Sequence, residues 1–182
     1  MVITEGSEKM IKDLFLCMLI VGAVLSRLLP HPPNFTPITA IALFAGMYFD
    51  RKYAVILPLI ILAMSDYVIG FYSGWYWVYG SFMLIGLLSI WLRGNFGPTQ
   101  VMLTSTTGSI IFYLVTNFGV WLTSGMYPMT EVGLFECYVA AIPFFRNTFL
   151  GDLVYTVLLF GTYEAFEAFM SRMGYSTTRT VA

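Results

Sequence analysis

Five polar side chains lie inside or beside strongly hydrophobic segments of this chain, where such groups are costly. They are Asp66, Asn117, Arg146, Asn147 and Asp152. An ionisable side chain at the centre of a membrane helix costs roughly 2.5–3.5 kcal/mol on insertion scales, so it should face a partner, a cavity or a substrate. Carboxylate, guanidinium and amide groups offer charge and hydrogen bonds to a small polar molecule. These residues are therefore the candidate polar contacts of a substrate-binding site.

A second set of candidates is aromatic and consists of Trp75, Trp77, Trp121 and Tyr127. Trp and Tyr at the density seen in residues 71–79 are typical of a membrane–water interface. Their rings also stack on planar ligands. We interpret these four residues as walls of the same site, and an interfacial belt is the alternative.

Catalytic and metal-binding patterns are missing from the sequence. There is no His-Glu-x-x-His, no Gly-x-Ser-x-Gly and no phosphate-binding glycine loop. His31, Cys17 and Cys137 are too few and too far apart for a structural zinc site. We expect no enzymatic activity, no metal and no cofactor. An intramembrane aspartyl site remains an alternative, and it requires the carboxylates of Asp66 and Asp152 to approach one another.

The composition around these residues is that of an integral membrane protein. Of the 182 residues, 58% are hydrophobic and 10% are charged. This length suits one all-α transmembrane domain over residues 1–182, a compact bundle of about six helices of roughly 20 residues each. Residues 1–13 are expected to form a cytoplasmic N-terminal segment and residues 171–182 a cytoplasmic tail. A net charge of −1 and the absence of basic runs exclude nucleic acid as a partner.

Hydrophobic runs bounded by proline, glycine or charged residues predict the helices. Three spans are expected at about 14–29, 35–49 and 53–70, a fourth after the aromatic run and ending at Trp91, and the last two at 101–122 and 138–170. The second span is rich in small residues, which allow close helix packing. The third contains Pro58, which requires neighbours that satisfy the carbonyl it frees. The last is too long for one span, so Pro143 is expected to divide a short interfacial piece from the true helix, after an aqueous loop over 123–136.

The basic residues predict the orientation. Seven of the nine Lys and Arg residues fall on one side of the six-span arrangement, and Arg27 and Arg146 approach the other. The positive-inside rule then puts both termini in the cytoplasm. In this orientation all the candidate site residues lie in the outer half of the bundle.

The same topology suggests which polar groups meet. Arg146 and Asp152 are six residues apart and so lie on different faces of one helix. We expect Arg146 to pair with Asp66, and Asp152 to bond with Asn117 or with a hydroxyl of a neighbouring span. For each of these groups the alternative to substrate contact is a structural ion pair or an internal hydrogen-bonded network.

Four stretches carry a likeness to known proteins: Pro33–Gly46, Leu62–Asp66, Gly125–Pro128 and Ala141–Asp152. They resemble an uncharacterised bacterial family of six-span membrane proteins, which implies that the chain lies in a bacterial inner membrane. That family is similar, in turn, to the substrate-binding S components of energy-coupling-factor (ECF) vitamin transporters. This resemblance implies a six-helix bundle with an outward-facing pocket, and a membrane coupling subunit with two ATPases as partners. The Ala-x-x-x-Ala docking pattern of S components is replaced here by Gly22-x-x-x-Ser26 and Ala42-x-x-x-Gly46.

Together these observations favour a membrane protein that binds a small, vitamin-like nutrient from the outer side and moves it inward across the lipid bilayer. The alternative is a structural or assembly protein without a small-molecule substrate, whose polar residues only lock helices together. The two hypotheses differ in whether any ligand stabilises the folded chain.

Overall fold

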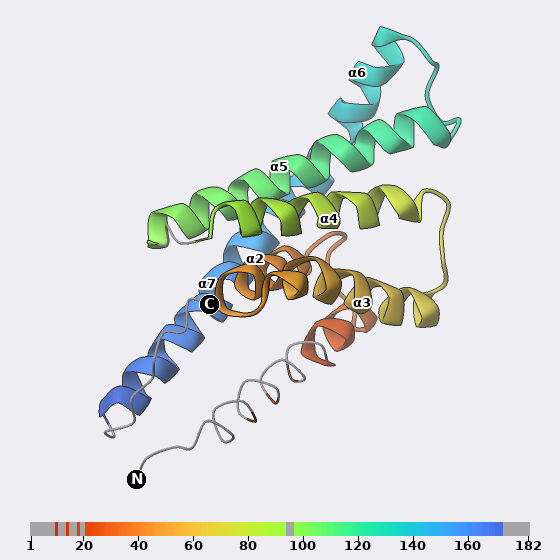
Figure 1. The fold of residues 1–182 in the computed structure, drawn as a ribbon. Coiled ribbons are helices and arrows are strands. Elements are labelled where there is room, and N and C mark those ends of the chain that lie inside the picture. The colour runs from red at the N-terminus through yellow and green to blue at the C-terminus, as the bar shows by residue number, and fades with distance from the viewer. Residues whose placement is uncertain (1–9, 11–13, 15–17, 19–20, 94–96, 173–182) are drawn as a thin grey trace.

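The computed structural model describes residues 10, 14, 18, 21–93 and 97–172, apart from the side chains of residues 167 and 170, and its regular structure is entirely helical. Residues 21–28 form the continuous described stretch of the first helix, and residues 10, 14 and 18 are also helical. Six further helices follow (Figure 1): α2 (Ile38–Tyr48), α3 (Arg51–Ile69), α4 (Trp75–Trp91), α5 (Pro98–Thr123), α6 (Glu131–Ala140) and α7 (Ile142–Arg172). The predicted all-α class is confirmed.

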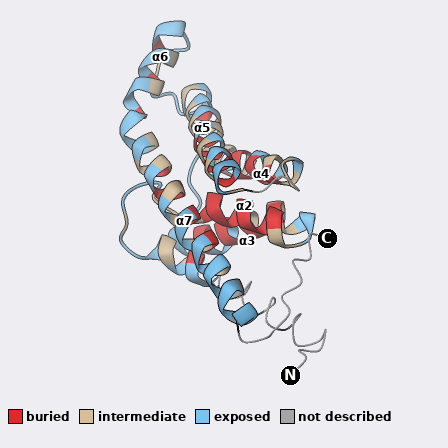
Figure 2. Ribbon diagram, turned by 90° about the vertical axis from the view of Figure 1, so that its left-hand side faces the viewer, coloured by how far each residue is buried: buried red, intermediate tan, exposed pale blue. Residues whose placement is uncertain are grey.

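Helix α2 forms the centre of the fold. Every residue from Ile38 to Met47 is buried, and α2 contacts α3, α4, α5 and α7. Figure 2 shows the buried residues gathered on α2 and on the faces of its neighbours. Small residues permit this close packing, because a Cβ at Gly46 would overlap the Ser89 side chain on α4. The expectation of close packing in this segment is therefore confirmed.

Pro58 lies buried within α3 and deprives the carbonyl of Ala54, one turn earlier, of its helical hydrogen bond. That carbonyl faces Gly86 on α4, where an added Cβ would lie only 2.5 Å from the Ala54 oxygen. Because Gly86 has no Cβ, α4 can pack closely against this oxygen. A neighbouring helix thus covers the proline-freed carbonyl, as the sequence predicts.

The second half of the chain departs from the predicted boundaries. Helix α6 occupies part of the loop expected over 123–136, and it begins where the Thr130 hydroxyl accepts a hydrogen bond from the amide of Gly133. This cap and Glu131 in the first turn both stabilise a helix start. The chain breaks at Ala141, and Pro143 lies in the first turn of α7, so the predicted division into a short piece and a long helix is confirmed.

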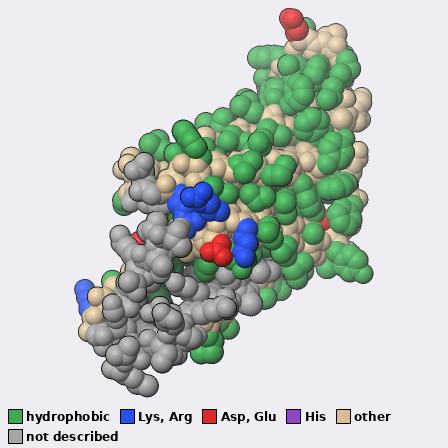
Figure 3. Space-filling model, in the orientation of Figure 1, with side chains coloured by type: hydrophobic (Ala, Val, Ile, Leu, Met, Phe, Trp, Pro, Cys, Tyr) green, Lys and Arg blue, Asp and Glu red, His purple; other side chains and the backbone are tan. Residues whose placement is uncertain are grey.

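The surface is mostly apolar. Figure 3 shows a face covered by hydrophobic side chains with few charged groups, while Ser, Thr and Asp side chains are buried in the interior. Three of the described helices are long and apolar enough to cross a membrane: Arg51–Ile69, Pro98–Thr123 and Ile142–Phe166. Helices α2 and α4 are shorter apolar helices. These features indicate association with a membrane.

The predicted terminal segments are only partly covered. Of residues 1–13 the structure describes only residue 10, and Cys17 also lies outside the described residues. Of the predicted tail, 171–182, it describes Ser171 and Arg172, which still belong to α7. The long helix therefore continues slightly beyond its predicted end.

Candidate functional site

A cavity of about 300 Å³ lies between the helices near α2. Its wall combines residues from the first helix, the following loop, the connection between α3 and α4, and helices α2, α3, α4, α5 and α7. The residues that line it are Arg27, His31, Asn34, Thr36, Ile38, Thr39, Leu62, Ile69, Tyr72, Val78, Phe82, Phe112, Thr148 and Asp152. The cavity therefore places an arginine and an aspartate from opposite ends of the chain around one space.

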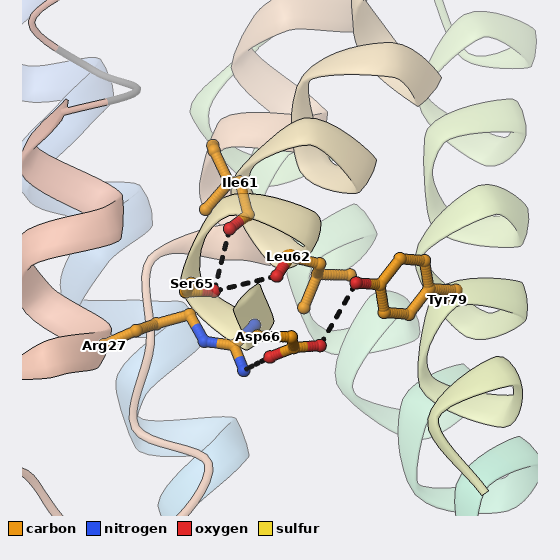
Figure 4. Close-up of polar contacts among 6 residues, drawn as sticks. All are labelled: Arg27, Ile61, Leu62, Ser65, Asp66 and Tyr79. Carbon is orange, nitrogen blue, oxygen red and sulfur yellow. Dashed lines mark hydrogen bonds and ion pairs between the residues drawn. The ribbon is translucent and has the colours of Figure 1, made fainter. Parts of the chain in front are cut away.

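Arg27 is held in place by Asp66, which also accepts a hydrogen bond from Tyr79 (Figure 4). Its Nη2 donates to Asp66 Oδ1 at 2.7 Å, and the Tyr79 hydroxyl donates to Asp66 Oδ2 at 3.1 Å. The Asp66 side chain is 1% exposed and that of Arg27 is 13% exposed. Charge and hydrogen bonds thus connect the first helix, α3 and α4 at the wall of the cavity.

The second terminal nitrogen of Arg27 has no hydrogen-bond partner among the described residues. Nη1 is buried, and within the described part of the chain no hydrogen-bond acceptor contacts it. A buried guanidinium N–H without an acceptor is costly. Because Arg27 lines the cavity, this donor is the clearest unmet polar requirement at its wall.

The predicted pair of Arg146 with Asp66 is wrong. Both Asp66 oxygens are engaged by Arg27 and Tyr79, while Arg146 is exposed on α7. The first helix, rather than α7, supplies the cation. Arg27 also stands within a hydrophobic segment, the first one, where an ionisable side chain is equally costly. That signal was therefore present in the sequence.

Asp152 is 2% exposed and receives hydroxyl hydrogen bonds. Ser109 Oγ on α5 donates to its Oδ2 at 2.6 Å, and Thr39 on α2 also hydrogen-bonds to the carboxylate. One turn further along α7, Thr156 bonds with Ser105 of α5 at 3.1 Å. The predicted hydroxyl partner from a neighbouring helix is confirmed. The alternative partner, Asn117, instead donates to the Tyr113 carbonyl of its own helix at 2.8 Å.

The loop after the first helix covers part of the cavity. His31 Nδ1 lies 2.7 Å from the Leu29 carbonyl. Because a carbonyl only accepts, Nδ1 is the donor in this contact. Asn34 has φ 64°, a left-handed conformation that Asn tolerates better than most residues. Phe35 packs against Tyr155 with ring centroids 5.5 Å apart, which fixes this loop on α7.

The predicted aromatic walls lie elsewhere. Trp75 is exposed and packs on Tyr79, with ring centroids 4.9 Å apart. Trp77 is half-buried against α5, where a Cβ at Gly119 would overlap its ring. Trp121 Nε1 donates to the Pro128 carbonyl at 3.0 Å and so braces the turn before α6. None of these rings lines the cavity.

The remaining predicted residues, Tyr127 and Asn147, are partly exposed and also lie outside the cavity lining. Of the nine predicted contacts, Asp152 lines the cavity directly and Asp66 acts through Arg27. Besides Arg27 and the apolar lining, the residues that sequence reasoning did not select carry hydroxyl, amide or imidazole groups, namely His31, Asn34, Thr36, Thr39, Tyr72 and Thr148. Their residue types are common at helix ends and turns, so no sequence signal sets them apart.

Cys137 is packed inside the protein. It is 2% exposed, and its thiol donates to the Asn117 carbonyl at 3.4 Å. Among the described residues, no group of three or more His, Cys, Asp and Glu side chains could hold a metal ion.

Comparison with curated proteins and with solved structures finds no match. A family of unknown function, DUF6580, matches residues 8–173. This match covers most of the chain, including every residue that lines the cavity. The chain therefore belongs to the DUF6580 family, whose function is unknown.

Proposed function

We propose that this chain is a multi-pass membrane protein that captures a small nutrient in the cavity and moves it across the bilayer. The observation that carries this proposal is the cavity of about 300 Å³, lined by both Arg27, with its unpaired Nη1, and the buried Asp152. Ligand pockets of roughly 300–1,000 Å³ are typical for small molecules. The volume therefore suits a compact, vitamin-like ligand.

The proposed arrangement in the membrane follows the sequence-based orientation, with about six spans and both termini in the cytoplasm of a bacterial cell. Apolar side chains outside and hydroxyls inside support such an arrangement. By analogy with S components, the proposed partners are the bilayer, the small-molecule substrate, and a membrane coupling subunit with its ATPases.

The small-residue pairs differ in their suitability for docking that subunit. Ala42 and Gly46 are buried within α2, so they cannot meet another protein. Gly22 is exposed, and a Cβ there would meet no atom within 4 Å. The proposed docking face is therefore the first helix around Gly22.

The test begins with gently purified protein. Small molecules released on denaturation are identified by mass spectrometry, and a vitamin library is screened for compounds that raise Tm. We expect at least one compound both to co-purify and to stabilise the protein. If no compound does either, the structural or assembly role gains the support instead.

A matched pair of variants then locates the site. Thr148→Val removes a hydroxyl from the cavity wall without changing the shape of the side chain, and Thr162→Val makes the same change at an exposed position of α7. The Tm increase given by the ligand should shrink for Thr148→Val and persist for Thr162→Val. Equal responses would place the ligand outside the cavity.

A further inference from the structure

The geometry points to a substrate class: a small organic cation whose protonated amine contacts Asp152 and whose neutral hydrogen-bond acceptor, a carbonyl or hydroxyl, contacts Arg27. This inference rests on the proposed function, since it specifies what the same cavity binds.

The charge balance of the cavity wall favours a cation. Arg27 and Asp66 neutralise one another at 2.7 Å. Among the described residues no ion pair includes Asp152, whose contacts are the hydroxyls of Ser109 and Thr39. A buried carboxylate without a cationic partner is unfavourable. A ligand ammonium group would supply the missing positive charge.

Asp152 also has room for further donors. An ionised carboxylate accepts up to about four hydrogen bonds, and the two hydroxyls occupy only part of this capacity. A protonated amine carries several N–H donors on one small group. The amine therefore matches the remaining acceptor positions as well as the charge.

Arg27 determines the second group expected on the ligand, a neutral hydrogen-bond acceptor. Its buried Nη1 needs an acceptor, but the guanidinium charge is already compensated by Asp66. A neutral carbonyl or hydroxyl satisfies this donor without adding charge. A ligand carboxylate would add negative charge to a space that already faces Asp152, with Asp66 just behind Arg27.

The rest of the wall suits a carbon skeleton. Ile38, Leu62, Phe82 and Phe112 supply apolar surface, and Tyr72 adds a further ring. Aromatic faces also attract organic cations.

The test uses purified full-length protein in detergent and four probes with one phenyl-bearing skeleton. Phenylalaninamide is a cation with a carbonyl, phenethylamine a cation without one, 3-phenylpropionamide a neutral amide, and phenylalanine a zwitterion. Isothermal titration measures each affinity. Phenylalaninamide should bind about tenfold or more tightly than the others, as expected for the loss of one charge-assisted hydrogen bond. Equal or tighter binding of the zwitterion or the neutral amide, or binding of none of the probes, would overturn the inference.

The variant Asp152→Asn adds a test of the contact. It removes the charge and keeps the shape, so phenylalaninamide should weaken about tenfold while 3-phenylpropionamide should not. Asp50→Asn is the control, because it makes the same change on an exposed carboxylate. Unchanged phenylalaninamide affinity in Asp152→Asn would contradict the contact. Should that variant not fold, the ranking of the four probes on the unaltered protein decides alone.

The experiments distinguish a wrong assignment of the substrate as a cation from a wrong proposed function. If the co-purified or stabilising compound proves neutral or anionic, the cavity is a binding site and the cation inference is wrong. If no compound co-purifies, none in the library stabilises the protein and no probe binds, both proposals fail.

Discussion

Both oxygens of Asp66 accept from side chains of other segments, Arg27 before it and Tyr79 after it. Replacing both members of a buried ion pair together often changes the free energy of unfolding little. Removing only one partner is destabilising, because it leaves an uncompensated charge in the interior. The arrangement therefore fixes where Arg27 lies and makes it sensitive to substitution.

The first prediction concerns this pair. Arg27→Met should lower the free energy of unfolding by about 3–5 kcal/mol, because it leaves Asp66 buried without a cation. SDS-induced unfolding in detergent, followed by circular dichroism, measures the change. Arg146→Met is the control at an exposed position and should change stability by only about 0.5 kcal/mol. Similar losses in both variants would argue against the observed pairing.

A double variant isolates the interaction itself. Asp66→Asn should cost less stability in the Arg27→Met background than in the unaltered chain, because the two residues contact one another. Additive losses would mean that the ion pair contributes nothing beyond packing.

A second prediction concerns Cys137, on α6 outside the three candidate spans. Burial raises the pKa of this thiol above its ordinary value, so less thiolate is present at neutral pH. The thiolate is the reactive form. In a Cys17→Ser background, maleimide labelling at neutral pH should be severalfold slower in the folded protein than after SDS unfolding, as measured by mass spectrometry. Equal labelling rates would show that the thiol is accessible and ionised in the folded state.

At the scale of the element, the contact between α3 and α4 depends on one glycine. The third prediction is that Gly86→Ala lowers stability by about 1–3 kcal/mol, because its Cβ would displace α4 from the Ala54 carbonyl. Gly80→Ala on the same helix is the control, since its Cβ meets no atom within 4 Å. That change should be neutral or slightly stabilising. SDS unfolding compares the two, and a larger loss at Gly80 would refute this view of the packing.

Helix positions could be predicted well from the sequence, because proline, glycine and charge interrupt the apolar runs. The exception is α6, because the sequence predicts a loop over Thr130 and Glu131. Short helices carry little periodic signal. The site was harder to predict. Asp152 was found because a carboxylate in an apolar run is conspicuous, whereas Thr39 and Thr148 belong to a residue type common throughout the chain.

The remaining differences between the predicted and the observed contacts depend on how the helices pack together. Arg27 and Asp66 lie 39 positions apart, and topology alone did not indicate which of two arginines would reach the carboxylate. The positions of the tryptophans could not be predicted, because large amphipathic rings are as favourable at a membrane interface as in a binding pocket.

For the whole molecule, the fourth prediction tests the proposed orientation. Alkaline phosphatase inserted at the exposed Gly125 should be active, because this turn is expected outside the cytoplasm. The same insertion after Arg93, in the connection between α4 and α5, should be inactive. Enzyme activity in intact cells, normalised to the amount of fusion protein, gives the comparison. The reverse pattern would invert the proposed orientation.

The burial of α2 has a consequence for how the chain is made. Eleven residues give a helix of about 16 Å, short of the roughly 30 Å hydrocarbon core, so α2 is unsuited to insertion into lipid as an independent span. It is enclosed partly by α7, which contacts it and is synthesised after helices α2 to α6. Until α7 emerges from the ribosome, α2 lacks one wall and the cavity lacks Asp152. A nascent chain that stops before α7 would therefore present an unfinished core to the cell's quality-control proteases.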